Sequence, residues 1–555
     1  MKKEKKEVEK KIKIIPLGGL DGIGKNITLF EYEDDIIIVD CGIKFPSDDM
    51  PGIDFIIPDF SYLIKNKSRI KGLVVTHGHE DHIGAIPYLL MELNIPIYSF
   101  KLTIGLIQSR LEEKKPKSPP VFVEAKPHEP IKIGKFTVEF IRVNHSIIDG
   151  ASLAIKTDAG TIIHTGDFKI DFTPVDGHVT DLTRFAEIGE EGVLLLMSDS
   201  TNAERPGYTR SESILEKKLV DIFSSAKGKI IVATFASNIH RIQQIFNAAK
   251  IYNKFVTVTG LSMLKNIEIA SKLGYLNINE NMIVSVEKAN ALPPKKLVVI
   301  GTGSQGEPMS ALSRISSGTH KFFKVHKGDT VIITASVIPG NERMVYNVVN
   351  GLMRLGVEVH YERDPDIHVS GHGSEEELKL MISLTRPKFF MPIHGEYKHL
   401  IAHTKIAELL GIKPSMIHIA NNGDIMELSN KSFKKNGVIN LSQIYVDGQE
   451  IGNLESSLIT DRQTMSTEGI IFITIVTSDG MLIREPEIQT RGLVGVKNVK
   501  VLNTIRHDAE KEAHRLLAKH YGPREVEMEV TKHMKNSIYK LVRRNPLINV
   551  QVVDI

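Results

Sequence analysis

Short apolar runs broken by glycine and acidic turns predict that the first third of the chain consists mainly of strands. The runs Ile12 to Leu17, Ile27 to Glu31 and Asp35 to Val39 have the composition of strands. Two further runs, Gly72 to Thr76 and Val193 to Met197, lead directly into polar residues. Many strands with few helices between them predict sheets flanked by helices. Further strands are expected at 135–143, 151–157 and 160–165, and a helix at 84–93.

The pattern changes near Thr209, where strands begin to alternate with longer helical segments. This alternation continues to about Ser370 and is typical of βαβ units, so it predicts an inserted α/β domain with a mostly parallel sheet. Its expected strands are 229–234, 255–259, 296–300 and 330–335, and its expected helices are 211–224 and 239–252.

The last part of the chain predicts a small α+β domain. A strand at Lys388 to Pro392 is followed by a connector that begins near Ser442, and then by strands at 470–477 and 549–553 around helices at 503–520 and 526–543. A chain of 555 residues is too long for one hydrophobic core. We therefore expect an N-terminal tail (1–13), a core domain in two parts (14–208 and 371–442), an inserted domain (209–370), a linker (443–468) and a C-terminal domain (469–555).

Composition adds a few limits to this picture. The net charge of 70 − 67 = +3 neither requires nor excludes a nucleic-acid partner. Cys41 is the single cysteine, so an intrachain disulfide is impossible. The Lys- and Glu-rich N-terminus is not a secretory signal, and no run reaches the roughly 18 apolar residues of a membrane span. We expect a cytoplasmic protein with no membrane partner.

The strongest chemical signal is a cluster of histidines directly after the strand that ends at Thr76. His77, His79 and His82 lie within six positions, together with Asp81. Residues two apart in an extended loop point the same way, so His77 and His79 can share one ion. Asp81 and His82 begin the next turn and can face a neighbouring ion. Imidazole with carboxylate suits zinc or manganese. The alternative is a solvated polar loop, but this spacing at a strand end is improbable by chance.

The H-x-H-x-D-H pattern resembles the signature of the metallo-β-lactamase fold, an αββα sandwich. The resemblance implies further ligands at later strand ends. His145 follows the strand that ends at Val143, Asp167 lies in a T-G-D sequence, and His394 follows the strand that ends at Pro392. Taken alone, His145 would be interpreted as a surface histidine, and only its place in this ordered series makes it a candidate ligand.

The inserted domain extends the resemblance to the β-CASP group of metallo-β-lactamase nucleases. That group has an acid at a strand end and a later histidine, which Asp199 and His372 match, before the last ligand His394. The chain also resembles the bacterial ribonuclease J family. The segments that carry this likeness are Gly18 to Asn26, Phe235 to Asn238, Gly303 to Pro308, Ile338 to Glu342, Arg484 to Pro486 and Thr490 to Gly492.

The resemblance implies a ribonuclease that hydrolyses phosphodiesters with two divalent metal ions. Zn²⁺ is the expected ion, with Mn²⁺ or Mg²⁺ as alternatives. The implied activity is 5′-to-3′ exonuclease and endonuclease cleavage of single-stranded RNA, with preference for 5′-monophosphate ends, in rRNA maturation and mRNA decay. We expect one ion on His77, His79 and His145, a second on Asp81, His82 and His394, and Asp167 bridging both.

The remaining site predictions concern the substrate and a structural cation. His372 is expected to steady the phosphoryl oxygens or to protonate the leaving 3′ oxygen, and Asp199 to orient a histidine. Asp54 and Asp447, in Gly/Asp-rich loops, are candidates for a structural Ca²⁺, with solvated turn aspartates as the alternative. Substrate phosphate contacts are expected from His368, Val369, Ser370, Gly371 and His372, and more weakly from Ser237 and Asn238.

Two glycine-rich segments allow other interpretations. Gly301 to Gly306 is a literal G-x-G-x-x-G, but the end of the next strand offers Ser336 where a dinucleotide site needs an acid. Gly19 to Asn26 nearly matches a Walker A loop, but Asn26 replaces the Ser or Thr that would hold Mg²⁺.

Rival functions remain open at the level of the sequence. They are a DNA nuclease with the same metal core, a non-catalytic RNA-binding scaffold, and a paralogue subunit of a ribonuclease complex. Because all seven ligand positions are filled, the scaffold hypothesis is disfavoured. We expect a homodimer or homotetramer, with a heteromer that includes a paralogue as an alternative.

Overall fold

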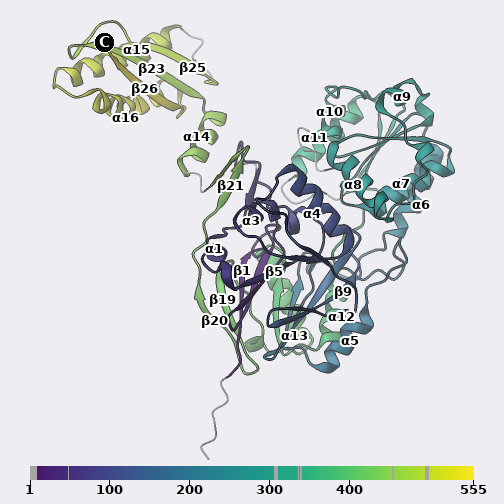
Figure 1. The fold of residues 1–555 in the computed structure, drawn as a ribbon. Coiled ribbons are helices and arrows are strands. Elements are labelled where there is room, and N and C mark those ends of the chain that lie inside the picture. Colours follow the sequence, from purple (N-terminus) through teal and green to yellow (C-terminus); the bar gives the residue numbers. More distant parts are fainter. Residues whose placement is uncertain are drawn as a thin grey trace, which may run out of the picture. The chain divides into compact units, whose positions relative to one another are not determined.

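The computed structural model describes residues 9–47, 49–304, 310–335, 337, 341–364, 366–452, 456–493 and 499–555. The chain divides into two compact units, residues 1–45 with 56–443 and residues 46–55 with 444–555. Figure 1 shows the elements of each unit. Three segments discussed above, 1–8, 305–308 and 338–340, lie outside the described residues.

Two sheets form the centre of the first unit. Eight of the described strands form one sheet, in the order β20-β19-β1-β2-β3-β5-β6-β7, and six form the other, in the order β18-β12-β11-β10-β9-β8. The first sheet comprises β1 (Ile12–Gly18), β2 (Ile27–Tyr32), β3 (Asp35–Val39), β5 (Ile70–Val74), β6 (Ile97–Ser99), β7 (Phe122–Glu124), β19 (Asp424–Leu428) and β20 (Phe433–Val438). The second comprises β8 (Ile131–Ile133), β9 (Phe136–Val143), β10 (Gly150–Thr157), β11 (Gly160–His164), β12 (Leu195–Asp199) and β18 (Phe389–Ile393).

The second sheet is buried on both faces, which explains its continuous apolar runs. Phe140 belongs to a core that both sheets share, whereas Ile141 belongs to a second core that includes Phe185, Leu378 and Ile406 from helices. These helices are α5 (Leu182–Glu191), α12 (Glu375–Thr385) and α13 (Tyr397–Leu409). Sheets stacked with helices outside are the layers of the metallo-β-lactamase sandwich, as predicted.

The inserted domain is a parallel α/β domain, as the alternating pattern predicted. Its described strands follow the order β14-β15-β13-β16-β17, and the neighbouring strands in this order pair in parallel. The strands are β13 (Ile230–Ala233), β14 (Phe255–Val258), β15 (Leu297–Gly301), β16 (Thr330–Ile333) and β17 (Glu358–His360). The helices include α6 (Ser213–Ser225), α7 (Ile239–Ile251), α8 (Leu261–Lys272), α9 (Val286–Ala291), α10 (Ala311–Ser316) and α11 (Glu342–Arg354).

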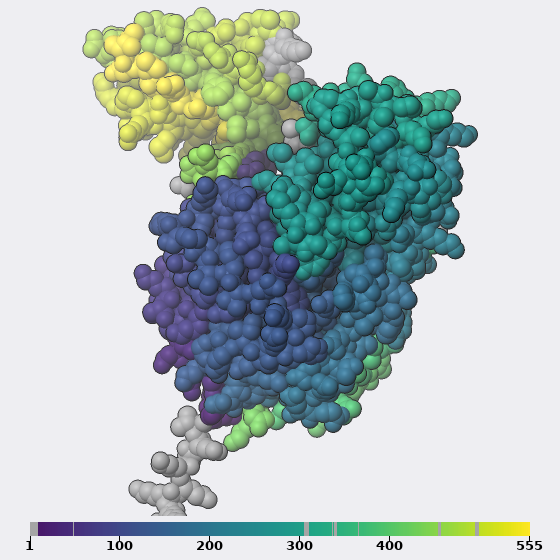
Figure 2. Space-filling view, turned by 45° about the vertical axis from the view of Figure 1, so that its right-hand side comes forward, coloured from purple at the N-terminus to yellow at the C-terminus, as the bar shows by residue number. Residues whose placement is uncertain are grey.

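The inserted domain packs directly on the sandwich. Helix α8 contacts α4 (Lys101–Glu113), and the Lys265 Nζ atom pairs with Glu113 Oε1 at 2.7 Å. At Gly105 an added Cβ would lie 2.9 Å from Ile269 and 3.0 Å from Leu273, so this glycine allows the helices to approach closely. Figure 2 shows the teal surface of the insert lying against the blue surface of the sandwich.

Two predicted segments differ from the structure. The helix expected at 84–93 is two short helices, α2 (Glu80–Ile83) and α3 (Ile86–Glu92), with Gly84 at the C-cap of α2 and Pro87 in the first turn of α3. The expected linker 443–468 contains the strands β21 (Ile444–Asp447) and β22 (Glu450–Gly452) and the helix α14 (Ser456–Thr467). The sequence of α14 is largely polar and lacks an apolar stripe, so it gave no helical signal.

The second unit has the predicted α+β architecture. Strand β23 (Ile470–Ser478) pairs with β24 (Met481–Leu482) and β25 (Glu487–Arg491) in antiparallel fashion and with β26 (Leu547–Asp554) in parallel. The helices α15 (Val499–Leu517) and α16 (Pro523–Val542) bury Ala509, Val530 and Ile538 against Ile471 and Ile473 of β23. Among the described helices, none combines the length and the apolar character required to cross a membrane.

Candidate metal centre

The predicted ligands lie in loops that follow strand ends. His77 and His79 follow β5, and Asp81 and His82 begin α2. The others follow three strands of the second sheet, His145 after β9, Asp167 after β11 and His394 after β18. The fold therefore brings residues more than 300 positions apart into one site.

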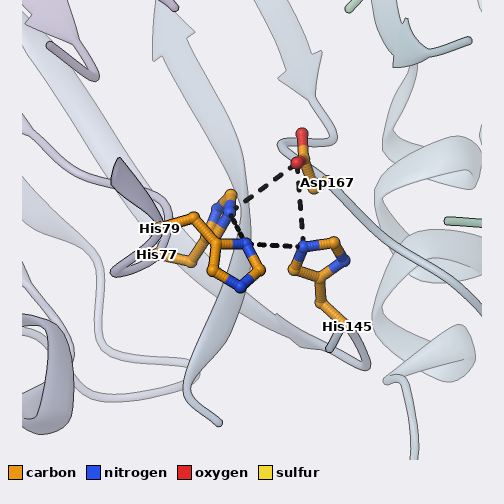
Figure 3. A group of neighbouring side chains, drawn as sticks. All are labelled: His77, His79, His145 and Asp167. Carbon is orange, nitrogen blue, oxygen red and sulfur yellow. Dashed lines mark hydrogen bonds and ion pairs between the residues drawn. The ribbon is translucent and has the colours of Figure 1, made fainter. Parts of the chain in front are cut away.

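The first group of donors consists of three imidazoles and one carboxylate. His79 Nδ1 lies 3.1 Å from His77 Nε2 and 3.0 Å from His145 Nε2. Asp167 Oδ2 lies 3.7 Å from both His77 Nε2 and His145 Nε2. Figure 3 shows these four side chains directed toward a common point. All four donor atoms lie within 4.8 Å of one another.

The second group shares Asp167 with the first. Asp167 Oδ2 lies 3.3 Å from His82 Nε2 and 3.7 Å from His394 Nε2. Asp81 Oδ2 completes the group at 3.6 Å from His82 Nε2 and 3.4 Å from His394 Nε2. Asp167 is therefore the one carboxylate that faces all four neighbouring imidazole nitrogens.

Each ligand histidine has a second ring nitrogen that does not belong to the donor group. In four of the five histidines this nitrogen has a polar partner. His77 Nδ1 lies 3.0 Å from Thr76 Oγ1, and His145 Nδ1 lies 2.6 Å from the Gly371 carbonyl oxygen. His82 Nδ1 lies 2.8 Å from Asp40 Oδ2, and His394 Nδ1 lies 2.8 Å from Thr201 Oγ1. A proton on each of these nitrogens leaves the lone pair of Nε2 directed at the donor group. Such second partners orient histidine ligands in metal sites.

The donor set fits divalent metal ions. Imidazole nitrogens and carboxylate oxygens are ligands for zinc and manganese. Asp167 Oδ1 is buried and has no hydrogen-bond partner among the described residues, although a buried carboxylate oxygen normally has one. An ion beside Asp167 would satisfy this atom. The residues therefore fit two ions that share Asp167.

Burial and charge act differently on the two groups. Burial lowers the pKa of His77 and His145 well below the ordinary value and lowers that of His79 to about 4. Burial also opposes protonation of His82 and His394, but the surrounding carboxylates, with Asp167 the strongest of them, together outweigh it. The pKa of His82 is raised, and that of His394 is raised to about 10. The first group thus favours neutral imidazoles, which bind metals directly.

Near the second donor group, a glycine allows two backbone segments to pass close to each other. At Gly42 an added Cβ would lie 1.5 Å from the Asp81 carbonyl oxygen, so only glycine allows the ligand loop to pass there. Asn26, which made the Gly19–Asn26 segment resemble a Walker A loop, has its Nδ2 atom 3.0 Å from His82 Nε2 and 3.3 Å from Asp81 Oδ2. This loop precedes strand β2 and covers the ligands, whereas a phosphate loop precedes a helix.

His372 and Asp199 lie beside the donor groups as a hydrogen-bonded pair. His372 Nδ1 lies 2.8 Å from Asp199 Oδ2, and its ring stacks on His394 with the ring centroids 5.4 Å apart. Burial lowers the pKa of His372, but the Asp199 carboxylate outweighs burial and the net shift is upward. Asp199 Oδ1 also accepts a hydrogen bond from Thr201 Oγ1 at 2.8 Å. Asp199 is thus well placed to orient His372.

The predicted substrate loop runs along the same side of the site. Asn202 Nδ2 donates to Ser370 Oγ at 2.8 Å, and the Gly371 carbonyl holds His145 as described above. His368 Nδ1 lies 3.3 Å from the Thr334 carbonyl, and its buried Nε2 has no hydrogen-bond partner among the described residues. The Val369 side chain is buried.

The two weaker predicted phosphate contacts lie at the start of helix α7. Asn238 caps α7, since its Oδ1 accepts from Arg241 N at 3.0 Å. Ser237 lies one residue earlier and is partly exposed. These two residues stay predictions as phosphate contacts.

The structural-cation prediction gains no geometric support. Asp54 Oδ2 accepts from Gly448 N at 2.7 Å, and Asp447 Oδ2 pairs with Arg462 at 2.6 Å. Neither aspartate belongs to a donor group found within the described part of the chain. The calcium ion stays a prediction.

Several residues of the site had no sequence signal that singled them out. Asp40 ends strand β3 with φ +60°, and it accepts hydrogen bonds from Thr76 N at 2.7 Å and Thr76 Oγ1 at 2.9 Å. Thr201 contacts both Asp199 and His394. The one signal at Asp40 is an acid directly after a buried strand, and its role depends on a loop 36 residues away.

Four models of known protein families match successive segments of the chain. Residues 20–184 match the metallo-beta-lactamase superfamily, and residues 227–352 match the beta-CASP domain of ribonuclease J. Residues 356–416 match a Zn-dependent metallo-hydrolase RNA specificity domain, and residues 457–555 match the ribonuclease J C-terminal domain. Fold and site therefore define a metallo-β-lactamase hydrolase of the β-CASP group.

Individual relatives identify the family within this class of hydrolases. Ribonuclease J of Synechocystis sp. is 42% identical over 96% of this chain and 84% of its own length. Ribonuclease J of Thermus thermophilus is 40% identical over 98% of this chain and 95% of its own. Ribonuclease J2 of Bacillus subtilis is 40% identical over 89% of each chain. The chain belongs to the ribonuclease J family, and it is a metal-dependent ribonuclease.

A solved structure agrees at the level of the fold. A protein of unknown function from Enterococcus faecalis V583 aligns with a TM-score of 0.54 over 76% of this chain and 100% of that chain. At 15% identity it supports the fold alone.

Proposed function

We propose that this ribonuclease removes nucleotides from single-stranded RNA in the 5′-to-3′ direction, prefers 5′-monophosphate ends and also cuts internally. The observation that carries the proposal is the position of the His372–Asp199 pair beside two donor groups that share Asp167. Ribosomal RNA maturation and mRNA decay in the cytoplasm are the processes that need this activity. We propose that the protein acts as a homodimer or homotetramer, or as a heteromer with a paralogue.

The two donor groups give the metal assignment. His77, His79 and His145 would hold one ion, Asp81, His82 and His394 would hold the other, and Asp167 would contact both. The mixed nitrogen and oxygen donors favour Zn²⁺, with Mn²⁺ and Mg²⁺ as the alternatives to test. When bound, two such ions supply an activated water and neutralise negative charge on the phosphoryl oxygens.

His372 would supply the proton for the leaving group. Its Nδ1 atom is held by Asp199, so Nε2 is the nitrogen that can reach substrate. The raised pKa of His372 keeps the ring protonated at higher pH than an ordinary histidine, which suits a general acid. A proton from Nε2 would go to the departing 3′ oxygen, and Asp199 would stabilise the imidazolium.

The segment from His368 to His372 would bind the substrate phosphate. Ser370 Oγ is fixed by Asn202 and by His372 N at 3.2 Å, so the loop is held in one conformation. His368 Nδ1 faces the Thr334 carbonyl oxygen at 3.3 Å, and its buried Nε2 atom has no hydrogen-bond partner among the described residues. Burial lowers the pKa of His368 to about 3, so Nε2 would donate to a phosphate oxygen only after the charge of the bound phosphate has protonated the ring.

Two rival functions predict different results. A DNA nuclease with the same metal core would cut DNA and RNA equally. A non-catalytic RNA-binding scaffold, or a paralogue subunit that is inactive alone, would cut neither, although all seven predicted ligands lie in the donor groups.

The test compares end-labelled single-stranded RNA with a 5′-monophosphate, the same RNA with a 5′-triphosphate, and matching DNA. Each is incubated with added Mn²⁺, Mg²⁺ or Zn²⁺, and Asp81→Ala is the control. We expect mononucleotide release from the monophosphorylated RNA, absent in the control. Equal cutting of DNA, or no cutting of any substrate, would overturn the proposal.

A further inference from the structure

A second cavity lies apart from the ligand atoms, on the loops that follow β9 and β11. Its volume is about 320 Å³, at the lower end of the roughly 300–1,000 Å³ typical of small-ligand sites. None of the predicted metal ligands lines it. Its wall includes the half-buried Arg142, the exposed Phe172 and Val179, and the acids Asp171 and Asp181.

The acids of this cavity are already engaged. Asp171 Oδ2 accepts from Glu212 N at 3.0 Å and lies 3.6 Å from Lys169 Nζ. Asp181 Oδ1 accepts from Arg184 N at 3.1 Å, and its Oδ2 lies 3.0 Å from His128 Nε2. Lys169 offsets the charge of Asp171, whereas Asp181 is held by a backbone N–H and a histidine ring.

Arg142 differs from these acids. Across the described residues, its guanidinium group has no hydrogen bond and no ion pair, although the side chain is half-buried in the cavity wall. A half-buried arginine normally has a carboxylate or carbonyl partner, because withdrawing the charge from water is costly. The cavity wall therefore holds an arginine whose planar donors are not engaged by the described residues and suit a phosphate.

Phe172 adds an aromatic surface to the wall of the same cavity. Its side chain is 65% exposed and lines the cavity. An exposed aromatic ring next to an arginine is the usual combination for binding a nucleotide, with the base on the ring and the phosphate on the guanidinium.

We propose that this cavity is a nucleotide-binding site separate from the metal centre, in which Arg142 binds a phosphate and Phe172 stacks on a base. The ligand is either a free nucleoside 5′-monophosphate or one nucleotide of an RNA strand. The proposal rests on the proposed RNA cleavage in one respect only, because that reaction would bring the RNA strand or release the mononucleotide.

One residue links the cavity to the ligands. Asn144, next to His145, accepts through Oδ1 from Thr180 N at 2.9 Å and from Asp171 N at 3.3 Å. Both partners line the cavity. A nucleotide in the cavity would therefore rigidify the loop that carries His145.

The test measures binding on full-length metal-stripped protein, so that it is independent of cleavage. Saturation-transfer NMR and calorimetry with AMP and UMP form one arm, and a 10-nucleotide single-stranded RNA forms the other. The variants are Arg142→Ala, Arg142→Lys and Phe172→Ala. Phe45→Ala is the matched control, because Phe45 is also 65% exposed but is absent from the cavity wall. His372→Ala reports binding at the metal centre.

We expect Arg142→Ala and Phe172→Ala each to weaken binding about tenfold, in the range of one lost stacking or phosphate contact. Arg142→Lys should lose less, and Phe45→Ala should match the unchanged protein. An effect in the mononucleotide arm identifies a free nucleotide as the ligand, and an effect in the RNA arm alone identifies an RNA nucleotide. The proposal would be overturned if His372→Ala weakened binding while the cavity variants bound with unchanged affinity. It would also be overturned if none of these variants changed the affinity. Equal thermal midpoints exclude unfolding as the cause.

Discussion

Two buried clusters of ionisable side chains lie within the first unit, and they are built on opposite principles. At the metal centre, imidazoles and carboxylates converge with their lone pairs facing one another, as His77, His79 and His145 do around Asp167. At the junction with the inserted domain, Arg241 Nη2 meets Glu212 at 3.0 and 3.2 Å, so opposite charges meet directly. The junction neutralises itself, whereas the centre requires a cation from outside.

The junction also shows why burial of charge alone does not identify a functional site. Arg241 is 1% exposed and also donates to the Thr334 carbonyl. Burial raises the pKa of Glu212, but the charge and hydrogen bond of Arg241 together with the Lys169 charge outweigh it, and the net shift is downward. Perturbed pKa values thus occur in both clusters, and only the arrangement of donors separates them.

The largest expected effect is at the shared ligand. Asp167→Ala should reduce cleavage by about a thousandfold or more, since two ions supply several kcal/mol of transition-state stabilisation. Cleavage rate and bound metal are measured together, and an unchanged circular dichroism spectrum shows that the fold is intact. Retained turnover with full metal content would remove Asp167 from the centre.

His372→Ala should lower kcat by about 10²–10⁴-fold, the usual contribution of a general acid. Bound metal should stay the same, because His372 is not a ligand in this account. Asp199→Asn should show a smaller loss in the same direction, since the amide still contacts Nδ1. If His372→Ala also lost metal, the residue would be a ligand.

Glu212→Ala should destabilise the protein by about 3–5 kcal/mol, because it leaves the buried Arg241 charge without a partner. Equilibrium urea unfolding measures this change. The double variant Glu212→Leu with Arg241→Leu should recover most of the loss. A cost below about 1 kcal/mol for Glu212→Ala would mean that water reaches the junction, and the contrast with the metal centre would then fail.

Asp40→Asn should weaken metal binding about 10–100-fold, as is typical of residues that orient a histidine ligand. Asp40 holds His82 through Nδ1 and Thr76 through its hydroxyl. Competition with a chelator measures the affinity. Cys41→Ala, at the next buried position, is the control and should leave the affinity unchanged.

The smallest expected effect separates a helix cap from a phosphate contact. Asn238→Ala should cost about 1 kcal/mol of stability through loss of the cap. Asn238→Asp keeps the cap acceptor but adds a negative charge, so a rise in KM with unchanged stability would assign a phosphate contact. An unchanged KM in Asn238→Asp would leave Asn238 as a cap only.

Most of the architecture could be predicted because the buried strands are continuous apolar runs and the insert alternates regularly. Strand β3 has the predicted bounds of Asp35 to Val39, and β13 to β16 lie within a residue or two of their predicted ranges. The order of ligands along the chain could be predicted from the resemblance. Polar segments such as α14 could not, because nothing in their residue pattern repeats with a helical period.

The contacts around the ligand residues could not be predicted from the sequence. Asp40, Asn26 and Thr201 gain their roles only when distant loops meet, so no local pattern marks them. The Glu212 backbone N–H also donates to the Asp171 carboxylate, a contact across the two domains between residues 41 positions apart that no local pattern indicates. The ligand residues could therefore be predicted, whereas the contacts that orient them could not.

The most direct test of the account is a metal titration of the stripped protein. Cleavage of 5′-monophosphorylated single-stranded RNA is measured while Zn²⁺ or Mn²⁺ is added, and the bound metal is quantified by mass spectrometry. The account predicts no cleavage without metal and a maximum at two ions per chain, one for each donor group. Full cleavage by the stripped protein, or a maximum at two ions that persists in Asp167→Ala, would contradict it.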